Sequence, residues 1–207
     1  MLPNQAEELD PRVRRTRQSI VQAFMKLINQ KGFQAISVQD ITEQAGINRA
    51  TFYAHFPDKY ALLQRSIEEE FRGEVEKRML HACEFSTHNL HELIVAVCEF
   101  VGNAHARSPL AEEQFQSLVE AQVRMQVRRL LSRWLEKMPT LANPAISRER
   151  AATAACWAIY GLATEWSGNK RQPSADHFAD EVMPLVAANL GLTIELSSAD
   201  KGSRSES

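Results

Sequence analysis

The stretch Ala45–Lys59, AGINRATFYAHFPDK, places four aromatic or imidazole rings, one arginine and one lysine in a single short segment. A glycine near its start and a proline near its end leave room for only about two helical turns. A helix of that length is not stable alone, so we expect earlier helices of the chain to hold its inner face.

The rings in this segment divide into two sets. Phe52 and Phe56 lie four residues apart and join Ile47 on one face of the expected helix, whereas Arg49 and Tyr53 share another side. We therefore expect the two phenylalanines to pack inward and the arginine and the tyrosine to point outward.

Two expected helices precede this one. The first has a single apolar stripe and ends at Gly32. Ser37 and Asp40 have the spacing of a capping box and open the second helix, Gly46 permits a sharp turn after it, and Asn48 can cap the third. Three helices with a tight turn between the last two form a helix-turn-helix unit that presents its third helix outward. The stripe of the first helix consists of Ile20, Ala23, Phe24, Leu27 and Ile28.

Composition sets the broad class. The chain has 207 residues, of which 44% are hydrophobic, so it is long enough to bury a core. It contains no apolar run of about 18 residues, and its first ten residues lack the features of a signal peptide, so we expect a cytoplasmic protein. Cys83, Cys98 and Cys156 are far apart without a CxxC pair, and we expect small core residues rather than disulfides or a zinc ribbon.

Charge is distributed unevenly along the chain. The net charge is only −2, but the segment from Arg12 to Tyr60 carries eight basic and three acidic residues, a formal charge of +5. From Ala61 onward the formal charge is −4. A basic N-terminal part on an acidic body is typical of a protein that meets a polyanion at one end, although random scatter of surface charge is the simpler alternative.

The segment Ser37–Leu63 resembles the DNA-binding segment of the TetR/AcrR family of bacterial transcriptional regulators. The likeness rests on Gly-Ile, Thr-Phe-Tyr, His-Phe and Asp-Lys elements in this order, and it extends from near Arg15. It implies an N-terminal helix-turn-helix domain, here residues 1–62 with an arm at 1–13. The remainder, residues 63–196, would be a helical effector-binding and dimerisation domain in an all-α fold, followed by a disordered tail at 197–207.

Candidate DNA contacts follow from position and from the resemblance. Arg49 can pair with guanine O6 and N7 in a major groove, and Ala50 and Tyr53 can touch thymine methyl groups. Asn48 lies at the same helix start. The resemblance further implies phosphate contacts from Ser37, Thr51, Tyr53, His55 and Lys59.

Each of these assignments has a simpler alternative. The alternatives are that Tyr53 only packs on the first helix, that His55 is a surface histidine, and that Arg49 contacts only phosphate. For Lys59, by contrast, physical reasoning supports the phosphate contact, because this lysine follows Asp58 at a helix start, where backbone amides already favour an anion. The run Arg12, Arg14, Arg15 and Arg17 either lies along DNA or begins the first helix in solvent.

The body of the chain is helical throughout. One expected helix continues past Ile67 towards Leu80, and a second contains residues 90–104. The pattern from Ser108 to Met138 predicts two more helices, but it does not show where the first ends and the second begins. The next helix, capped by Ser147, is rich in alanine, and the last runs from Ser174 to near Gly191 with Pro184 inside it. Small residues permit close helix approach, so we expect a homodimer through the last two helices, the alternative being packing within one subunit.

A ligand-responsive regulator needs a cavity, and several bulky residues with polar handles are candidates for its lining. Trp and Met at helical spacing are also ordinary core residues. The candidates are Phe100, His105, Phe115, Gln122, Met125, Trp134, Trp157, Tyr160 and Trp166. His81, His88 and His91 near Cys83 are not a distinctive metal pattern, and we expect no metal site and no cofactor.

The sequence thus predicts a homodimeric repressor that a small-molecule effector releases from double-stranded operator DNA, with no membrane partner. The alternative is a constitutive or architectural DNA-binding protein without a ligand switch. An all-α enzyme is not expected, because none of the nucleotide-binding or hydrolase motifs GxSxG, HExxH, P-loop and dinucleotide fingerprint occurs.

Overall fold

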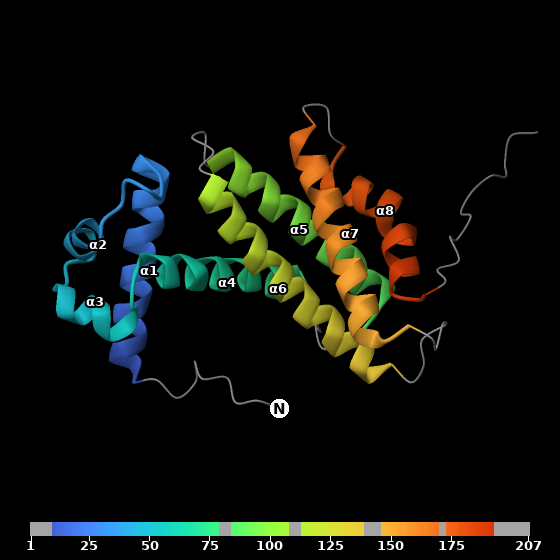
Figure 1. Cartoon of the computed structure of the whole chain (residues 1–207), viewed down its shortest axis with the longest axis horizontal. Helices are drawn as coiled ribbons and strands as arrows, with labels where there is room; N and C mark the ends of the chain where they lie inside the picture. Colours follow the sequence, from blue (N-terminus) through green and yellow to red (C-terminus); the bar gives the residue numbers. More distant parts are fainter. Residues whose placement is uncertain (1–9, 79–83, 108–112, 139–145, 170–172, 193–207) are drawn as a thin grey trace, which may run out of the picture. The chain divides into compact units, whose positions relative to one another are not determined.

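The computed structural model describes residues 10–78, 84–107, 113–138, 146–169 and 173–192. Within these ranges all regular structure is helical, which confirms the all-α class (Figure 1). The helices are α1 (Pro11–Lys31), α2 (Val38–Ala45), α3 (Arg49–His55), α4 (Lys59–Arg78), α5 (Thr87–Arg107), α6 (Glu113–Lys137), α7 (Arg148–Gly168) and α8 (Ala175–Asn189).

The chain divides into two compact units. The first consists of the described residues of Met1–Glu74 and Asn103–Val123, and the second of those of Val75–Gly102 and Arg124–Ser207. The first unit therefore contains α1 to α3 and most of α4. In the second unit α7 packs along α8.

Helix α1 forms as its apolar stripe predicts. Asp10 accepts a hydrogen bond from the Arg12 N–H at 2.8 Å, and Pro11 occupies the first helical position, where no N–H is needed. Gly32 ends the helix with φ 75°, a conformation that costs glycine little. All five residues of the predicted stripe are buried, and α2 packs against α1.

Helix α6 differs from the expectation of two helices. It is continuous for 25 residues from Glu113 to Lys137. The segment contains no glycine or proline, and a buried row at helical spacing supports it along its length. That row includes Val119, Val123, Val127, Leu130, Leu131, Trp134 and Leu135. The expected start at Ser108–Pro109 lies outside the described residues.

The last two helices begin at the predicted caps. The side chain of Ser147 accepts from the Arg150 N–H, and that of Ser174 accepts from the His177 N–H. Helix α8 continues through Pro184 as far as Asn189.

Two of the three cysteines, Cys98 and Cys156, are buried and unpaired, as predicted. Burial raises the pKa of the Cys98 thiol to about 12, so it behaves as a small apolar side chain. Cys83 and the predicted tail at 197–207 lie outside the described residues. Among the helices that the structure describes, none combines the length and apolar character needed to cross a bilayer.

Candidate DNA-binding site

The turn between α2 and α3 is built by three local features. Ser37 and Asp40 form a complete capping box, in which each side chain accepts from the backbone N–H of the other. Gly46 adopts the left-handed conformation, with φ 66° and ψ 35°, and ends α2. Asn48 then accepts from the Thr51 N–H at 2.7 Å and begins α3. The helix-turn-helix geometry predicted from the sequence is present.

The inner face of α3 is fixed by two phenylalanines. Phe52 is 0% exposed and Phe56 is 2% exposed, and their ring centroids lie 6.0 Å apart. Burying two such rings supplies the stabilisation that a helix of seven residues lacks by itself.

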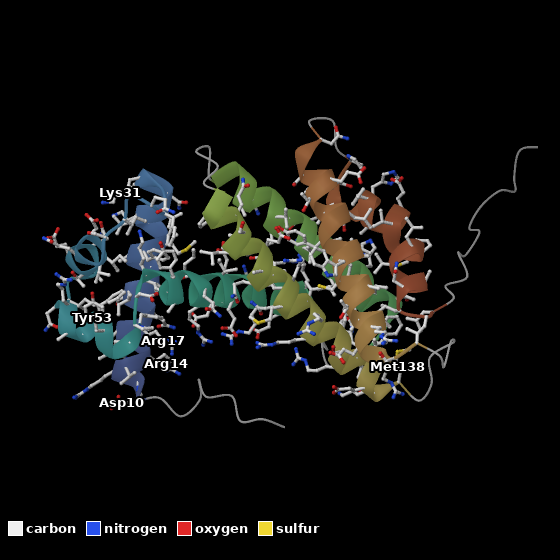
Figure 2. The ribbon with its side chains drawn as sticks, viewed as in Figure 1. Asp10, Arg14, Arg17, Lys31, Tyr53 and Met138 are labelled. Carbon is white, nitrogen blue, oxygen red and sulfur yellow. The ribbon has the colours of Figure 1, made fainter. Side chains whose placement is uncertain are left out.

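The outer face of α3 is open to solvent. Arg49, Ala50, Tyr53 and Ala54 are all exposed, and the Tyr53 side chain retains 49% of its accessible surface (Figure 2). The Tyr53 ring stands nearly perpendicular to that of Phe52, with centroids 5.4 Å apart. Contact with Phe52 therefore positions the tyrosine while about half of its surface remains accessible.

Two of the predicted contact residues also stabilise helix starts. The Asn48 side-chain oxygen Oδ1 accepts from the Thr51 hydroxyl at 3.0 Å as well as from the Thr51 N–H. The Ser37 hydroxyl donates to Asp40 at 2.6 Å, and Lys31 forms an ion pair with the same carboxylate at 2.8 Å. Hydrogen bonds from Lys31 and then Ser37 hold the pKa of the Asp40 carboxyl well below its usual range.

His55, at the end of α3, lies in a positively charged environment. Burial, and then the neighbouring Arg17 guanidinium, lower the pKa of this imidazole below its ordinary value. Arg17 itself lies over the Phe56 ring, 5.2 Å from the centroid. Burial, followed by repulsion from Arg65, also lowers the pKa of Arg17.

Lys59, at the start of α4, has a set of partners that the sequence did not suggest. Its ammonium donates to the backbone carbonyls of Phe33, Gln34 and Ile36 at 3.2, 3.2 and 2.9 Å. It also lies 4.7 Å from the centroid of the Phe33 ring. An ammonium group has three N–H donors, so these carbonyls occupy all of them and give Lys59 a structural function. Backbone carbonyls leave no signature in a sequence, which is why this arrangement was missed.

The N-terminal arginines belong to a helix in the described part of the chain. Helix α1 begins at Pro11, so Arg12, Arg14 and Arg15 are exposed side chains of its first turns rather than parts of an extended arm. Arg17 differs because it packs beneath α3. Residues 1–9 of the predicted arm lie outside the described residues.

The candidate ligand residues are divided between the two units. Phe115 and Gln122 belong to the first unit, where the ring centroids of Phe115 and Phe33 lie 6.2 Å apart. The others with described side chains belong to the second unit, where three are buried, two are intermediate and one is exposed. The buried residues are Phe100, Trp134 and Trp166, the partly exposed ones are Met125 and Tyr160, and the exposed one is Trp157. The side chain of His105 lies outside the described residues.

Trp157 is 56% exposed, and the Arg124 guanidinium stacks 3.8 Å from its ring centroid. A solvent-facing indole paired with a cation is not part of an enclosed core.

Comparison with known proteins supports the helix-turn-helix interpretation. Residues 20–65 match the family described as bacterial regulatory proteins, tetR family. The uncharacterized HTH-type transcriptional regulator YxbF of Bacillus subtilis is 40% identical over 63 residues, which are 30% of this chain and 17% of that protein. The first curated relatives are covered over only 15 to 27% of their own length.

Similarity of fold extends over most of the chain. The structure of NalD, described as the secondary repressor of the MexAB-OprM multidrug efflux pump in Pseudomonas aeruginosa, matches 92% of this chain and 100% of that one, with TM-score 0.54 and 18% identity. FadR from Bacillus subtilis, in complex with stearoyl-CoA, matches 83% of this chain and 98% of that one, with TM-score 0.54 and 16% identity. At these identities the likeness shows the fold alone: an N-terminal helix-turn-helix followed by a helical domain.

Proposed function

We propose that this chain is a cytoplasmic transcription regulator of the tetR family that binds double-stranded operator DNA, because residues 20–65 match the family of bacterial regulatory proteins of that name. The family is one of regulatory proteins rather than enzymes. The observation that carries the proposal is the division of α3 into a face anchored by Phe52 and Phe56 and a solvent-exposed face with Arg49 and Tyr53.

The exposed face of α3 suits the major groove of B-DNA. A groove about 12 Å wide admits an α-helix, and the N-terminal residues of a recognition helix contact base edges. Arg49 is the first residue of α3 and would read guanine, while Ala50 and Tyr53 would meet thymine methyl groups. Asn48 would contribute at the same helix start.

Phosphate contacts would orient the domain on the duplex. Ser37, Thr51, Tyr53 and His55 are all at least partly accessible, and each has a polar group that can bond a phosphate oxygen. Lys59 would contribute mainly through its charge, because its N–H groups are directed at backbone carbonyls in the free chain.

The proposed regulator is a homodimer through α7 and α8. The alanines of α7 divide into a buried set, which packs within the chain, and an accessible set near Trp157 and Gly161. A Cβ added to Gly161 would meet nothing within 4 Å in this chain, so the glycine leaves space against that face. Leu185 on α8 is 61% exposed and supplies apolar area there.

We further propose a repressor that loses DNA affinity when a small-molecule effector binds the helical domain. The FadR structure from Bacillus subtilis is in complex with stearoyl-CoA, which supports the proposal that a helical domain of this fold can bind a ligand. An effector acts by stabilising a conformation in which the two DNA-binding domains no longer match half-sites about 34–36 Å apart.

The decisive experiment is selection of genomic fragments by the purified chain at low salt, followed by competition with random duplex. We expect a sequence with two related half-sites to be enriched. Failure to retain any double-stranded DNA would overturn the proposal.

A thermal-shift screen of metabolites and drugs would address the switch. A compound that stabilises the protein and releases the selected DNA supports an effector-controlled repressor. If DNA binding is sequence-specific but no such compound emerges, the constitutive DNA-binding alternative is favoured.

A further inference from the structure

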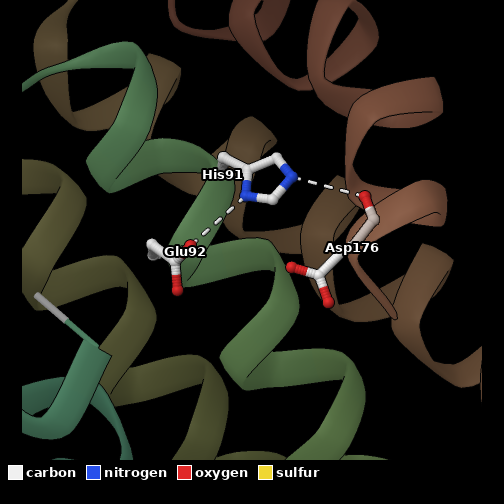
Figure 3. A group of neighbouring side chains, drawn as sticks. All are labelled: His91, Glu92 and Asp176. Carbon is white, nitrogen blue, oxygen red and sulfur yellow. Dashed lines mark hydrogen bonds and ion pairs between the residues drawn. The ribbon is translucent and has the colours of Figure 1, made fainter. Parts of the chain in front are cut away.

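A histidine of α5 lies against the first turns of α8 (Figure 3). The His91 Nε2 atom is 3.3 Å from the backbone carbonyl oxygen of Asp176 and 3.2 Å from Oδ1 of Asp180. A carbonyl oxygen can only accept a hydrogen bond, so the Nε2 atom must carry the proton.

The other ring nitrogen of His91 faces the carboxylate of Glu92. The Nδ1 atom of His91 is 3.6 Å from Oε1 of Glu92. One ligand atom each from His91, Glu92 and Asp176 can be chosen so that all three lie within 4.8 Å of one another. The three ligand atoms are therefore close enough for a single cation to lie between them.

Neighbouring groups orient the carboxylates. Arg78 Nη1 lies 3.5 Å from Oε2 of Glu92, so the guanidinium binds one oxygen and leaves the other facing the imidazole. Asp176 occupies the second position of α8, where the helix start is already capped by Ser174. Its carboxylate is therefore not required for capping.

We propose that His91 Nδ1, Glu92 and Asp176 form a binding site for a divalent transition-metal ion such as Zn²⁺. One imidazole nitrogen with two carboxylate oxygens favours such ions over Mg²⁺ and Ca²⁺, which prefer all-oxygen sites. The two carboxylates carry −2, which a divalent ion can balance. The remaining coordination positions are left for water.

The bonds at Nε2 have the form expected around a metal-bound histidine. Such a residue usually donates its second N–H to a carboxylate or a backbone carbonyl, which fixes the tautomer and strengthens the ligand. Here Asp180 and the Asp176 carbonyl provide both kinds of acceptor. The bound ion would join the starts of α5 and α8, which are far apart in the sequence.

The test is Zn²⁺ titration of the tag-free, metal-stripped full chain by calorimetry, together with Co²⁺ absorption as a report on ligation. We expect one equivalent per chain, a rise in the thermal midpoint, and loss of both signals in His91→Ala and Asp176→Asn. Asp180→Asn should bind about 10–100-fold more weakly, because it removes one acceptor at Nε2.

His88→Ala provides the matched control, because His88 is an exposed histidine of the same helix, and it should bind as the parent chain does. Circular dichroism of Asp176→Asn verifies that its fold is retained. Absence of metal uptake would overturn the site. Uptake that persists in both His91→Ala and Asp176→Asn would overturn it equally.

Discussion

At the scale of single residues, α3 separates two functions that its sequence interleaves. Phe52 is removed from water while its neighbour Tyr53 remains half exposed. The separation follows from helical periodicity, since adjacent residues point about 100° apart. Substitutions on the two faces should therefore have different consequences, one for affinity and the other for folding.

Arg49→Ala should weaken binding to the selected operator by about 1–3 kcal/mol and relax base preference at one position in each half-site. The reason is loss of a forked donor pair from the start of α3. Fluorescence anisotropy with single-base operator variants measures both effects. Arg129→Ala, which removes an exposed arginine of α6, is the control. An equal affinity loss on random duplex would assign Arg49 to phosphate instead.

His55 should make stability depend on pH. Its folded-state pKa lies below the ordinary value of about 6.5, so the unfolded chain binds more protons as pH falls through that value. Stability attributable to His55 is therefore present above about pH 6.5 and is lost as pH falls towards the lower folded-state pKa.

Thermal midpoints of parent and His55→Gln between pH 7.5 and 5 measure this contribution. We expect the variant to lose less stability over that interval. His177→Gln changes an exposed histidine of α8 and should follow the parent. Parallel curves for His55→Gln and the parent would contradict the assignment.

At the scale of elements, Lys59 joins the start of α4 to the loop between α1 and α2. Its three carbonyl partners belong to Phe33, Gln34 and Ile36, more than twenty positions earlier in the chain. The carbonyls of such a loop otherwise need water, so the lysine stabilises both the loop and the position of α4 within the first unit.

Lys59→Ala should lower the free energy of unfolding by about 1–3 kcal/mol, the scale of hydrogen bonds to a charged group. Chemical denaturation followed by circular dichroism measures it. Lys26→Ala, on the exposed side of α1, is the control. An unchanged midpoint would remove the structural role.

The salt dependence of DNA binding then tests the phosphate role of Lys59 separately. If the slope of log Kobs against log salt is smaller in Lys59→Ala than in the parent by about one unit per DNA-binding domain, Lys59 also contacts a phosphate.

At the scale of the whole molecule, the two units serve different parts of the proposed function. The first unit carries the exposed face of α3, and the second carries the accessible faces of α7 and α8. Two DNA-binding domains in one assembly increase both affinity and specificity, because a dimer reads two half-sites.

Leu185→Asp should shift the chain from dimer to monomer and reduce operator affinity at least tenfold, because it places a charge within the proposed apolar contact. Sedimentation velocity and anisotropy measure the two effects on the same samples. Glu181→Gln, one turn earlier on α8 and also exposed, tests whether any change on this helix has the same result. A Leu185→Asp protein that remains dimeric would place the interface elsewhere.

The sequence by itself determined the helices and most of their ends. The stripe of α1, the caps at Ser37, Asn48 and Ser147, and the glycine turn before α3 depend on local interactions, and all are present. The exposure of Arg49 and the burial of Phe52 follow from the same periodicity. The predicted break before Met138 was wrong, because helix continuity over 25 residues depends on the buried row that supports it.

Only the tertiary structure decided which distant groups meet. The carbonyls around Lys59, the packing of Arg17 on Phe56, and the approach of Asp176 to His91 join residues from different helices. No periodicity within one segment specifies such pairs, since they depend on how the helices pack. Backbone carbonyls, moreover, are common to every residue type. Sequence pattern therefore located the surface that we propose for DNA, whereas packing fixed the partners of the charged side chains around it.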